Sequence, residues 1–204
     1  MHKAIWLDTI NQEKIIQYKK LTGGVSSEVY HVKTNKNNYC IKRSLKRLLV
    51  KKKWIANTNR IKFEYLWLKH CQNILKRNIP NTYEFNNKKK YIVMEYLKTS
   101  QYKTLKQLYF NKIININTIR SISKHLYKIH SNSSNYKTKK TFEGNYKNFY
   151  DLRLDPYFNE VGRVYPKYKG YIKKINENYI KHSNTLVHGD FSPKNILVGK
   201  NKII

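Results

Sequence analysis

The 204-residue sequence contains only two cysteines, Cys40 and Cys71, and no apolar run near the ~18 residues that span a bilayer. So few cysteines exclude a disulfide-stapled scaffold and indicate a reducing compartment. The N-terminal segment MHKAIWLDTINQEK lacks an apolar core followed by small residues, which excludes a secretory signal. We therefore expect a cytoplasmic protein with no membrane partner.

Acidic residues are also scarce, at 12 against 42 basic residues, which gives a formal charge of +30. A charge of this size normally favours nucleic acid or another anionic partner. However, only seven of the basic residues are arginines, and the longest basic runs, Lys51–Lys53 and Lys88–Lys90, are short. Lys, Asn, Ile and Tyr, which all have A/T-rich codons, are abundant. Drift in an AT-rich genome therefore explains the excess of lysine, and these lysines would lie on the solvated surface. We do not expect a nucleic-acid partner, although weak attraction of phosphate-bearing partners stays open.

Hydrophobic residues make up 40% of the chain, which is enough for a buried core. The first hundred residues contain segments with the pattern of β-strands, at residues 15–21, 28–33, 39–43 and 91–97. Residues 60–75 change to helical spacing. This half of the chain predicts a mostly antiparallel sheet with one helix.

The second half has the spacing of helices. Ile119, Ile122, Leu126 and Ile129 recur every three to four residues, and residues 168–180 repeat the pattern. Residues 136–148 are polar and are expected to form a loop. The order, sheet first and helices second, predicts an α+β fold with two lobes that meet near residues 98–104.

The turn GGVSSEVY lies between two predicted strands. Glycines such as Gly23 and Gly24 let a backbone approach phosphate oxygens closely, and Ser26 and Ser27 can add hydroxyl donors. An ordinary hairpin turn explains the same residues. No G-x-x-x-x-G-K-[ST] string occurs, so the turn is not a P-loop.

Lys42 lies on the third predicted strand, in the string NYCIKR, where kinases carry a lysine for the nucleotide phosphates. Strand alternation places Cys40 on the same face, where it would meet the adenine ring. Glu64, on the following helix, is the expected counter-ion of Lys42, because an inward carboxylate without a partner is costly.

The strand IVMEYL has the character of a hinge between lobes. In this interpretation, the backbone around Glu95, Tyr96 and Leu97 would bind adenine. An ordinary core strand accounts for the pattern equally well.

The segment LVHGDFSPKNILV has H-x-D-x-x-x-x-N spacing between two apolar runs. The spacing predicts that Asp190 accepts the proton of a substrate hydroxyl and that the Asn195 amide oxygen binds Mg²⁺. Lys194 is placed to neutralise the transferred phosphoryl group. His188 is expected to brace the loop.

The phosphate acceptor is not apparent from the sequence. Cationic acceptors need clustered carboxylates, and the only such cluster outside the predicted site is DLRLDPYFNE, with Asp151, Asp155 and Glu160. Arg153 in the same string would equally suit an anionic acceptor, and Asp155 before a proline also suits a turn.

Taken together, these residues resemble the aminoglycoside phosphotransferase/choline kinase superfamily, whose catalytic loop has the signature H-G-D-x-x-x-x-N. Strings such as GGVSSEVY, FEYLWL and LRLDPYF are similar to those of a bacterial branch of uncertain substrate. The resemblance implies a bilobal protein-kinase-like fold and the transfer of the γ-phosphoryl group of ATP, with Mg²⁺, to a hydroxyl of a small molecule. It implies a nucleotide-binding lobe over residues 1–99 and a catalytic lobe over residues 100–204.

The resemblance also predicts an incomplete catalytic lobe, because related enzymes carry a second metal-binding aspartate and further helices after the catalytic-loop hairpin. The activity of this chain is therefore open. A non-catalytic nucleotide-binding pseudokinase is the alternative to an enzyme, and a basic RNA-binding module is the less favoured third hypothesis.

Overall fold

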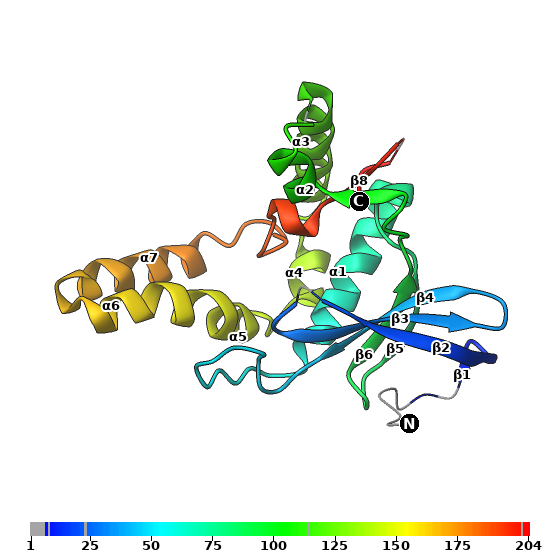
Figure 1. Ribbon diagram of the computed structural model, residues 1–204. Coiled ribbons are helices and arrows are strands. Elements are labelled where there is room, and N and C mark those ends of the chain that lie inside the picture. Colours follow the sequence, from blue (N-terminus) through cyan, green and yellow to red (C-terminus); the bar gives the residue numbers. More distant parts are fainter. Residues whose placement is uncertain (1–6, 8, 23, 114, 201) are drawn as a thin grey trace. The chain divides into compact units, whose positions relative to one another are not determined.

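The computed structural model describes residues 7, 9–22, 24–113, 115–200 and 202–204, which fold as two compact units (Figure 1). The first unit consists of Met1–Asn115 with Pro193–Ile204, and the second of Ile116–Ser192. None of the helices in the described ranges combines the length and hydrophobicity that a bilayer crossing requires.

The first unit is built on a six-stranded antiparallel sheet with the strand order β1-β2-β3-β4-β6-β5. Its strands are β1 (Thr9–Ile10), β2 (Glu13–Leu21), β3 (Ser27–Thr34), β4 (Asn38–Ser44), β5 (Thr82–Asn86) and β6 (Tyr91–Glu95). The sequence alternation located β2, β3, β4 and β6 but not β1 and β5.

Alternation along these strands separates a core face from a second face. Tyr30 and Val32 of β3 pair with Ile41 and Tyr39 of β4, and all four side chains are buried in one cluster. The intervening residues, including Cys40 and Lys42, therefore point to the opposite face. On β6 the consecutive residues 91–93 are all buried, as expected for a strand that is covered on both faces.

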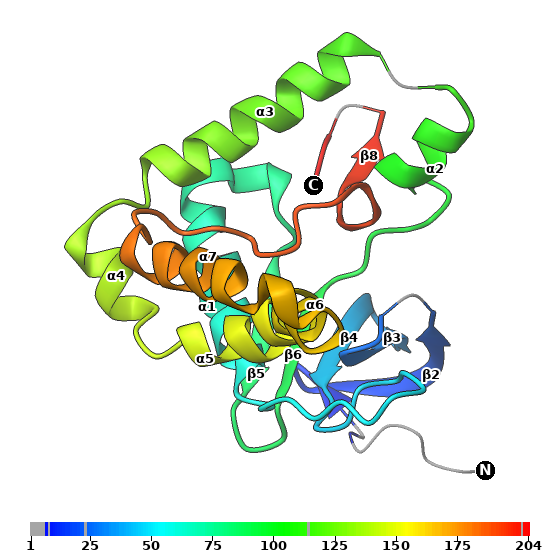
Figure 2. The same cartoon turned by 90° about the vertical axis from the view of Figure 1, so that its left-hand side faces the viewer.

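Helix α1 (Arg60–Leu75) covers the face that carries Cys40 and Lys42, since its Glu64 contacts Lys42. Its buried residues Ile61, Leu68, Cys71 and Leu75 recur at helical spacing, which is why this segment is helical. A short 3₁₀ turn, η1 (Lys76–Asn78), follows it. Figure 2 shows α1 beside the sheet strands.

A second, two-stranded sheet completes the first unit. β7 (Tyr102–Thr104) pairs antiparallel with β8 (Leu197–Gly199), and α2 (Leu105–Phe110) follows β7 directly. The 3₁₀ turn η4 (Pro193–Asn195) leads into β8. A Cβ atom at Gly199 would lie 2.8 Å from Cε1 of the Tyr102 ring, so a larger residue there would force the ring to move.

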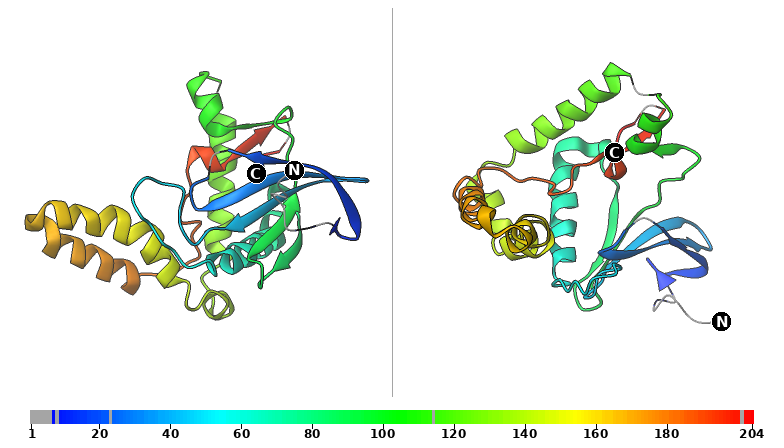
Figure 3. Two further views of the ribbon diagram at one scale, coloured as in Figure 1. Left: turned by 60° about the horizontal axis from the view of Figure 1, so that its bottom comes forward. Right: turned by 60° about the vertical axis from the view of Figure 1, so that its left-hand side comes forward.

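The second unit is helical. It contains α3 (Ile116–Ser131), α4 (Tyr136–Thr141), α5 (Tyr146–Phe149), the π-helix η2 (Tyr150–Asn159), α6 (Glu160–Val164), the 3₁₀ turn η3 (Pro166–Tyr168) and α7 (Lys169–Lys181). Helices α6 and α7 pack together, and both views of Figure 3 show them side by side.

The predicted α+β class, with an antiparallel sheet and one helix before a mainly helical part, is confirmed. The prediction of a loop over residues 136–148 is wrong, because α4 and α5 form there. Asn135 supplies the missing signal, since its side chain accepts a hydrogen bond from the Thr138 amide at 2.9 Å and caps α4.

Candidate functional site

Lys42 and Glu64 form an ion pair across the face between β4 and α1. The distance from Lys42 Nζ to Glu64 Oε1 is 2.6 Å, and the two side chains are 30% and 33% exposed. The pair is therefore neither sealed in the core nor fully solvated. A lysine held in this way keeps N–H donors that can reach a neighbouring anion. Its role toward a nucleotide stays a prediction.

Cys40 lies two residues before Lys42 on the same face and pairs across the strands with His31 of β3 and Met94 of β6. Burial raises the pKa of the Cys40 thiol to about 11, while the Lys42 charge acts in the opposite direction. Burial likewise raises the pKa of Cys71, to about 12. Both cysteines are therefore neutral thiols at physiological pH.

The turn between β2 and β3 is exposed at its tip and anchored at its end. Gly23 lies outside the described residues. Gly24 is exposed, Ser26 is half-buried and Ser27 is buried. The Leu45 amide donates to the Ser26 carbonyl at 3.1 Å, which attaches the turn to the chain after β4. Phosphate binding by these residues stays a prediction.

Arg60, the first residue of α1, is a buried arginine that sequence reasoning missed. Its Nη2 donates to the carbonyl oxygens of Ser26 and of Leu45, the latter at 2.7 Å, and its Nη1 donates to Asn57 at 2.7 Å. Burial lowers the pKa of this guanidinium from its ordinary value. Arg60 thus joins the β2–β3 turn, the segment after β4 and the start of α1 at one point.

The predicted hinge follows β6. The Glu95 amide donates to the Asn81 carbonyl at 2.8 Å, and the Asn81 amide donates to Glu95 Oε2 at 3.1 Å. The Tyr96 ring stacks on His31, with 3.7 Å between ring centroids. Leu97 is half-buried. These contacts fix the segment against β3 and β5, and adenine binding by it stays a prediction.

The catalytic-loop segment has a defined local geometry in the second unit. The Asp190 amide donates to His188 Nδ1 at 3.2 Å, so His188 contacts the loop backbone. Gly189 has a φ of +75°, a left-handed conformation that favours glycine over the arginine of H-R-D kinases. The Ser192 amide donates to the Asp190 carbonyl at 2.9 Å, which closes a tight turn after the aspartate.

Asp190 forms an ion pair with Arg153 of η2. The distance from Arg153 Nη2 to Asp190 Oδ2 is 3.2 Å, and Arg153 Nε donates to the Gly189 carbonyl at 2.7 Å. Sequence reasoning named Arg153 only as a possible contact of an anionic acceptor. The structure instead brings it to the predicted base.

Lys194 and Asn195 belong to η4, in the first unit, and both are exposed. The buried Ile196 follows them, and its carbonyl accepts a hydrogen bond from the Leu105 amide at 2.9 Å. This contact anchors the end of the loop to the start of α2. Asp190 belongs to the second unit.

The donors available for a metal ion are few. Asn195 supplies an amide oxygen, a ligand type that suits Mg²⁺. Within the described residues, no group of three or more His, Cys, Asp or Glu side chains is arranged to hold a metal. Mg²⁺ binding by Asn195 stays a prediction.

The acidic cluster of the second unit is paired with basic side chains. Asp155 Oδ1 contacts Arg163 Nη2 at 2.5 Å, and Glu160 Oε2 contacts Arg163 Nη1 at 2.8 Å. Asp151 Oδ1 lies 3.2 Å from Lys147 Nζ. These carboxylates are not arranged as an open acidic pocket for a cationic acceptor.

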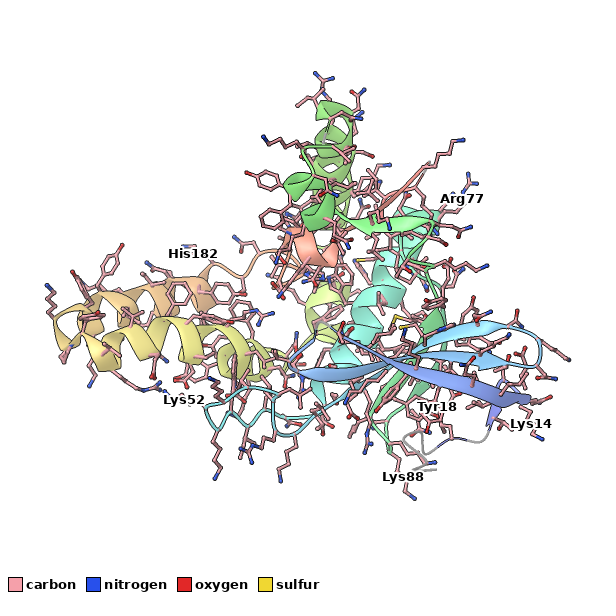
Figure 4. All side chains as sticks on the ribbon, viewed as in Figure 1. Lys14, Tyr18, Lys52, Arg77, Lys88 and His182 are labelled. Carbon is pink, nitrogen blue, oxygen red and sulfur yellow. The ribbon has the colours of Figure 1, made fainter. Side chains whose placement is uncertain are left out.

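The excess basic charge is dispersed over the first unit. Figure 4 labels Lys14 on β2, Lys52 in the loop before α1, Arg77 after α1 and Lys88 in the β5–β6 turn. These four basic residues lie on separate elements of the first unit.

We predict that both cysteines react slowly with iodoacetamide at about pH 8, because only the thiolate attacks. A pKa of about 11 for Cys40 leaves a thiolate fraction about 100-fold below that of an ordinary thiol. Mass spectrometry of the labelled protein checks this. Alkylation of the native protein within tenfold of the rate in denaturing guanidinium would contradict the burial of both thiols.

We predict that Arg60→Met lowers the free energy of unfolding by about 2–4 kcal/mol, because several buried carbonyl oxygens lose their donor. Faster hydrogen exchange across residues 25–29 should accompany the loss. Arg47→Met, at an exposed arginine between β4 and α1, is the matched control and should change stability by less than about 0.5 kcal/mol. Urea denaturation of both variants measures the difference, and equal midpoints would refute the role of Arg60.

Comparison with known proteins places this geometry in a family. The model of the fructosamine kinase family matches residues 2–204. No curated protein matches the chain significantly. Among solved structures, spectinomycin phosphotransferase APH(9)-Ia, in complex with ADP and spectinomycin, is 15% identical with a TM-score of 0.50. The alignment covers 94% of this chain and 63% of that protein.

LicA in complex with AMP is 16% identical with a TM-score of 0.51, over 94% of this chain and 61% of LicA. Choline kinase LicA from Streptococcus pneumoniae is 15% identical with a TM-score of 0.48, over 93% and 61%. At these identities the likeness to the spectinomycin phosphotransferase and to LicA in complex with AMP shows the fold alone, and the chain spans less than two thirds of the length of each solved protein. The match along nearly its whole length shows that the chain belongs to the fructosamine kinase family, within the kinase-like phosphotransferase superfamily.

Proposed function

We propose that the protein transfers the γ-phosphoryl group of ATP to a hydroxyl group of a small molecule. The observation that carries the proposal is the Lys42–Glu64 ion pair, at 2.6 Å on the sheet face that α1 covers. In protein kinases phosphoryl transfer depends on such a pair, because an oriented lysine positions the phosphates and offsets their charge. The fold is shared with proteins solved with ADP and AMP, which supports a nucleotide as the ligand.

In this proposal residues 1–99 bind the nucleotide and residues 100–204 carry the transfer. The β2–β3 turn, with Gly23, Gly24, Ser26 and Ser27, covers the phosphates. Cys40 and the Glu95–Leu97 segment contact the adenine. Asn195 would supply one oxygen ligand to Mg²⁺, which would add positive charge at the nucleotide phosphates.

Asp190 acts as the base. It accepts the proton of the acceptor hydroxyl, whose oxygen forms a bond to the γ-phosphorus while the bond to the bridging oxygen of ADP breaks. Lys194 offsets charge on the transferred group. His188 contacts the Asp190 amide and braces the loop without touching the reacting atoms.

The acceptor belongs to the class of hydroxyl-bearing small molecules. The family takes its name from fructosamines, which are sugar derivatives that carry an amine, and the spectinomycin phosphotransferase was solved with spectinomycin. Fructosamines are therefore the first acceptors to test. The paired carboxylates of the second unit provide no support for an aminoglycoside in particular.

We predict that Asp190→Asn lowers kcat by about 10²–10⁴-fold, because the amide cannot accept the proton. The affinity for ATP should stay within about threefold of the original protein, since the base contacts the acceptor rather than the nucleotide. Coupled detection of ADP and calorimetric titration of ATP measure the two quantities. Retained turnover would remove Asp190 as base, and nucleotide binding without turnover in the unmodified protein would favour the pseudokinase alternative.

We predict that Lys42→Met lowers kcat/KM for ATP on the order of 100-fold, because the phosphates lose an oriented cation. Lys33→Met on β3 is the matched control, since Lys33 is exposed and carries the same charge. An equal loss in both variants would show that net charge, rather than the ion pair with Glu64, attracts the nucleotide.

A further inference from the structure

Arg153 is a charged residue of the second unit that the proposed reaction has not yet used. It lies on η2 (Tyr150–Asn159), a π-helix that contains Pro156. π-helical turns are rare in proteins, and those that occur often lie at functional sites. The side chain is 31% exposed, so it is held against the protein over most of its surface.

Each nitrogen of the Arg153 guanidinium has an oxygen partner. Nε donates to the Gly189 carbonyl at 2.7 Å, Nη1 donates to the Leu152 carbonyl at 3.0 Å, and Nη2 lies 3.2 Å from Asp190 Oδ2. Two of these partners are consecutive residues of the catalytic loop. The arginine therefore contacts both the backbone next to the predicted base, at Gly189, and the side chain of the base itself, Asp190.

A bond within η2 helps to hold Arg153 in this position. Arg153 Nη1 donates to the carbonyl oxygen of the preceding residue, Leu152. The bond ties the guanidinium to its own helix, so that Nε and Nη2 point to the loop with little conformational freedom. A planar guanidinium can make these three bonds at once, whereas a lysine cannot.

We propose that Arg153 is the positioning residue of the catalytic base, holding the Gly189 carbonyl and one Asp190 oxygen so that the second oxygen meets the acceptor hydroxyl. This inference rests on the proposed function and deepens it. Arg153 does not touch the acceptor or the nucleotide in this role. It sets the orientation of the group that accepts the proton.

Arg163 offers the matched comparison in the same unit. It also pairs with carboxylates, Asp155 of η2 and Glu160 of its own helix α6, but neither partner belongs to the catalytic loop. Exposed pairs of this kind contribute little to stability. If Arg153 were only a structural ion pair, its replacement would resemble that of Arg163.

The test compares Arg153→Met, Arg153→Lys and Arg163→Met in the full chain. Arg153→Met should lower kcat about 100-fold, because a small displacement of a catalytic group has an effect of this size, while KM for ATP changes less than threefold. Arg153→Lys keeps the positive charge and serves as the second variant if Arg153→Met does not fold. It should recover less than a tenth of the lost rate. Arg163→Met should stay within twofold of the original protein.

Hydrogen–deuterium exchange over residues 186–192 provides a readout that needs no acceptor. Arg153→Met should accelerate exchange in this segment, and Arg163→Met should leave it unchanged. Unchanged exchange, or a kcat within twofold of the original protein, would overturn the positioning role. Asp190→Asn separates the two claims. If Asp190→Asn abolishes turnover and Arg153→Met does not, only this inference fails, whereas turnover retained by Asp190→Asn contradicts the proposed function.

Discussion

The contact between Lys42 and Glu64 determines how the first unit is assembled around its candidate site. It requires that β4 present Lys42 away from the buried Tyr39 and Ile41, and that α1 present Glu64 toward the same face. A shift of one residue in the β4 register would move Lys42 into the core and Ile41 to the helix side. The charged pair and the apolar core therefore specify the same register.

Two arginines organise the neighbouring loops by donating to backbone carbonyls. Arg60 joins the β2–β3 turn to the start of α1, and Arg153 joins the catalytic loop to η2. Glycine-rich and polar loops have few side chains of their own to pack, so their carbonyl oxygens need outside donors. A guanidinium satisfies several of them at once and gives the loop a single geometry without covering its outer surface.

The sequence predicted the strands and the helix that show a local periodic pattern. It did not predict contacts between residues that are far apart in the chain. The alternation of β3 and β4 located Lys42, and the helical spacing of residues 60–75 located Glu64. By contrast, Arg153 and Gly189 are 36 residues apart, and no local pattern signals their contact. The proline after LRLD was the only available clue to η2, and it equally suits a turn. The role of Arg60 was hidden because a buried arginine resembles any other basic residue in a chain with 42 of them.

The most direct test of the central claim is affinity labelling with an adenosine derivative that carries a sulfonyl fluoride in place of the phosphates. An oriented lysine beside the phosphate position attacks the sulfur and displaces fluoride, and peptide mass spectrometry then identifies the modified residue. We predict that Lys42 is labelled in preference to the other 34 lysines and that ATP protects it. Labelling spread over surface lysines, or labelling of Lys42 that ATP does not reduce, would contradict a nucleotide site at the Lys42–Glu64 pair.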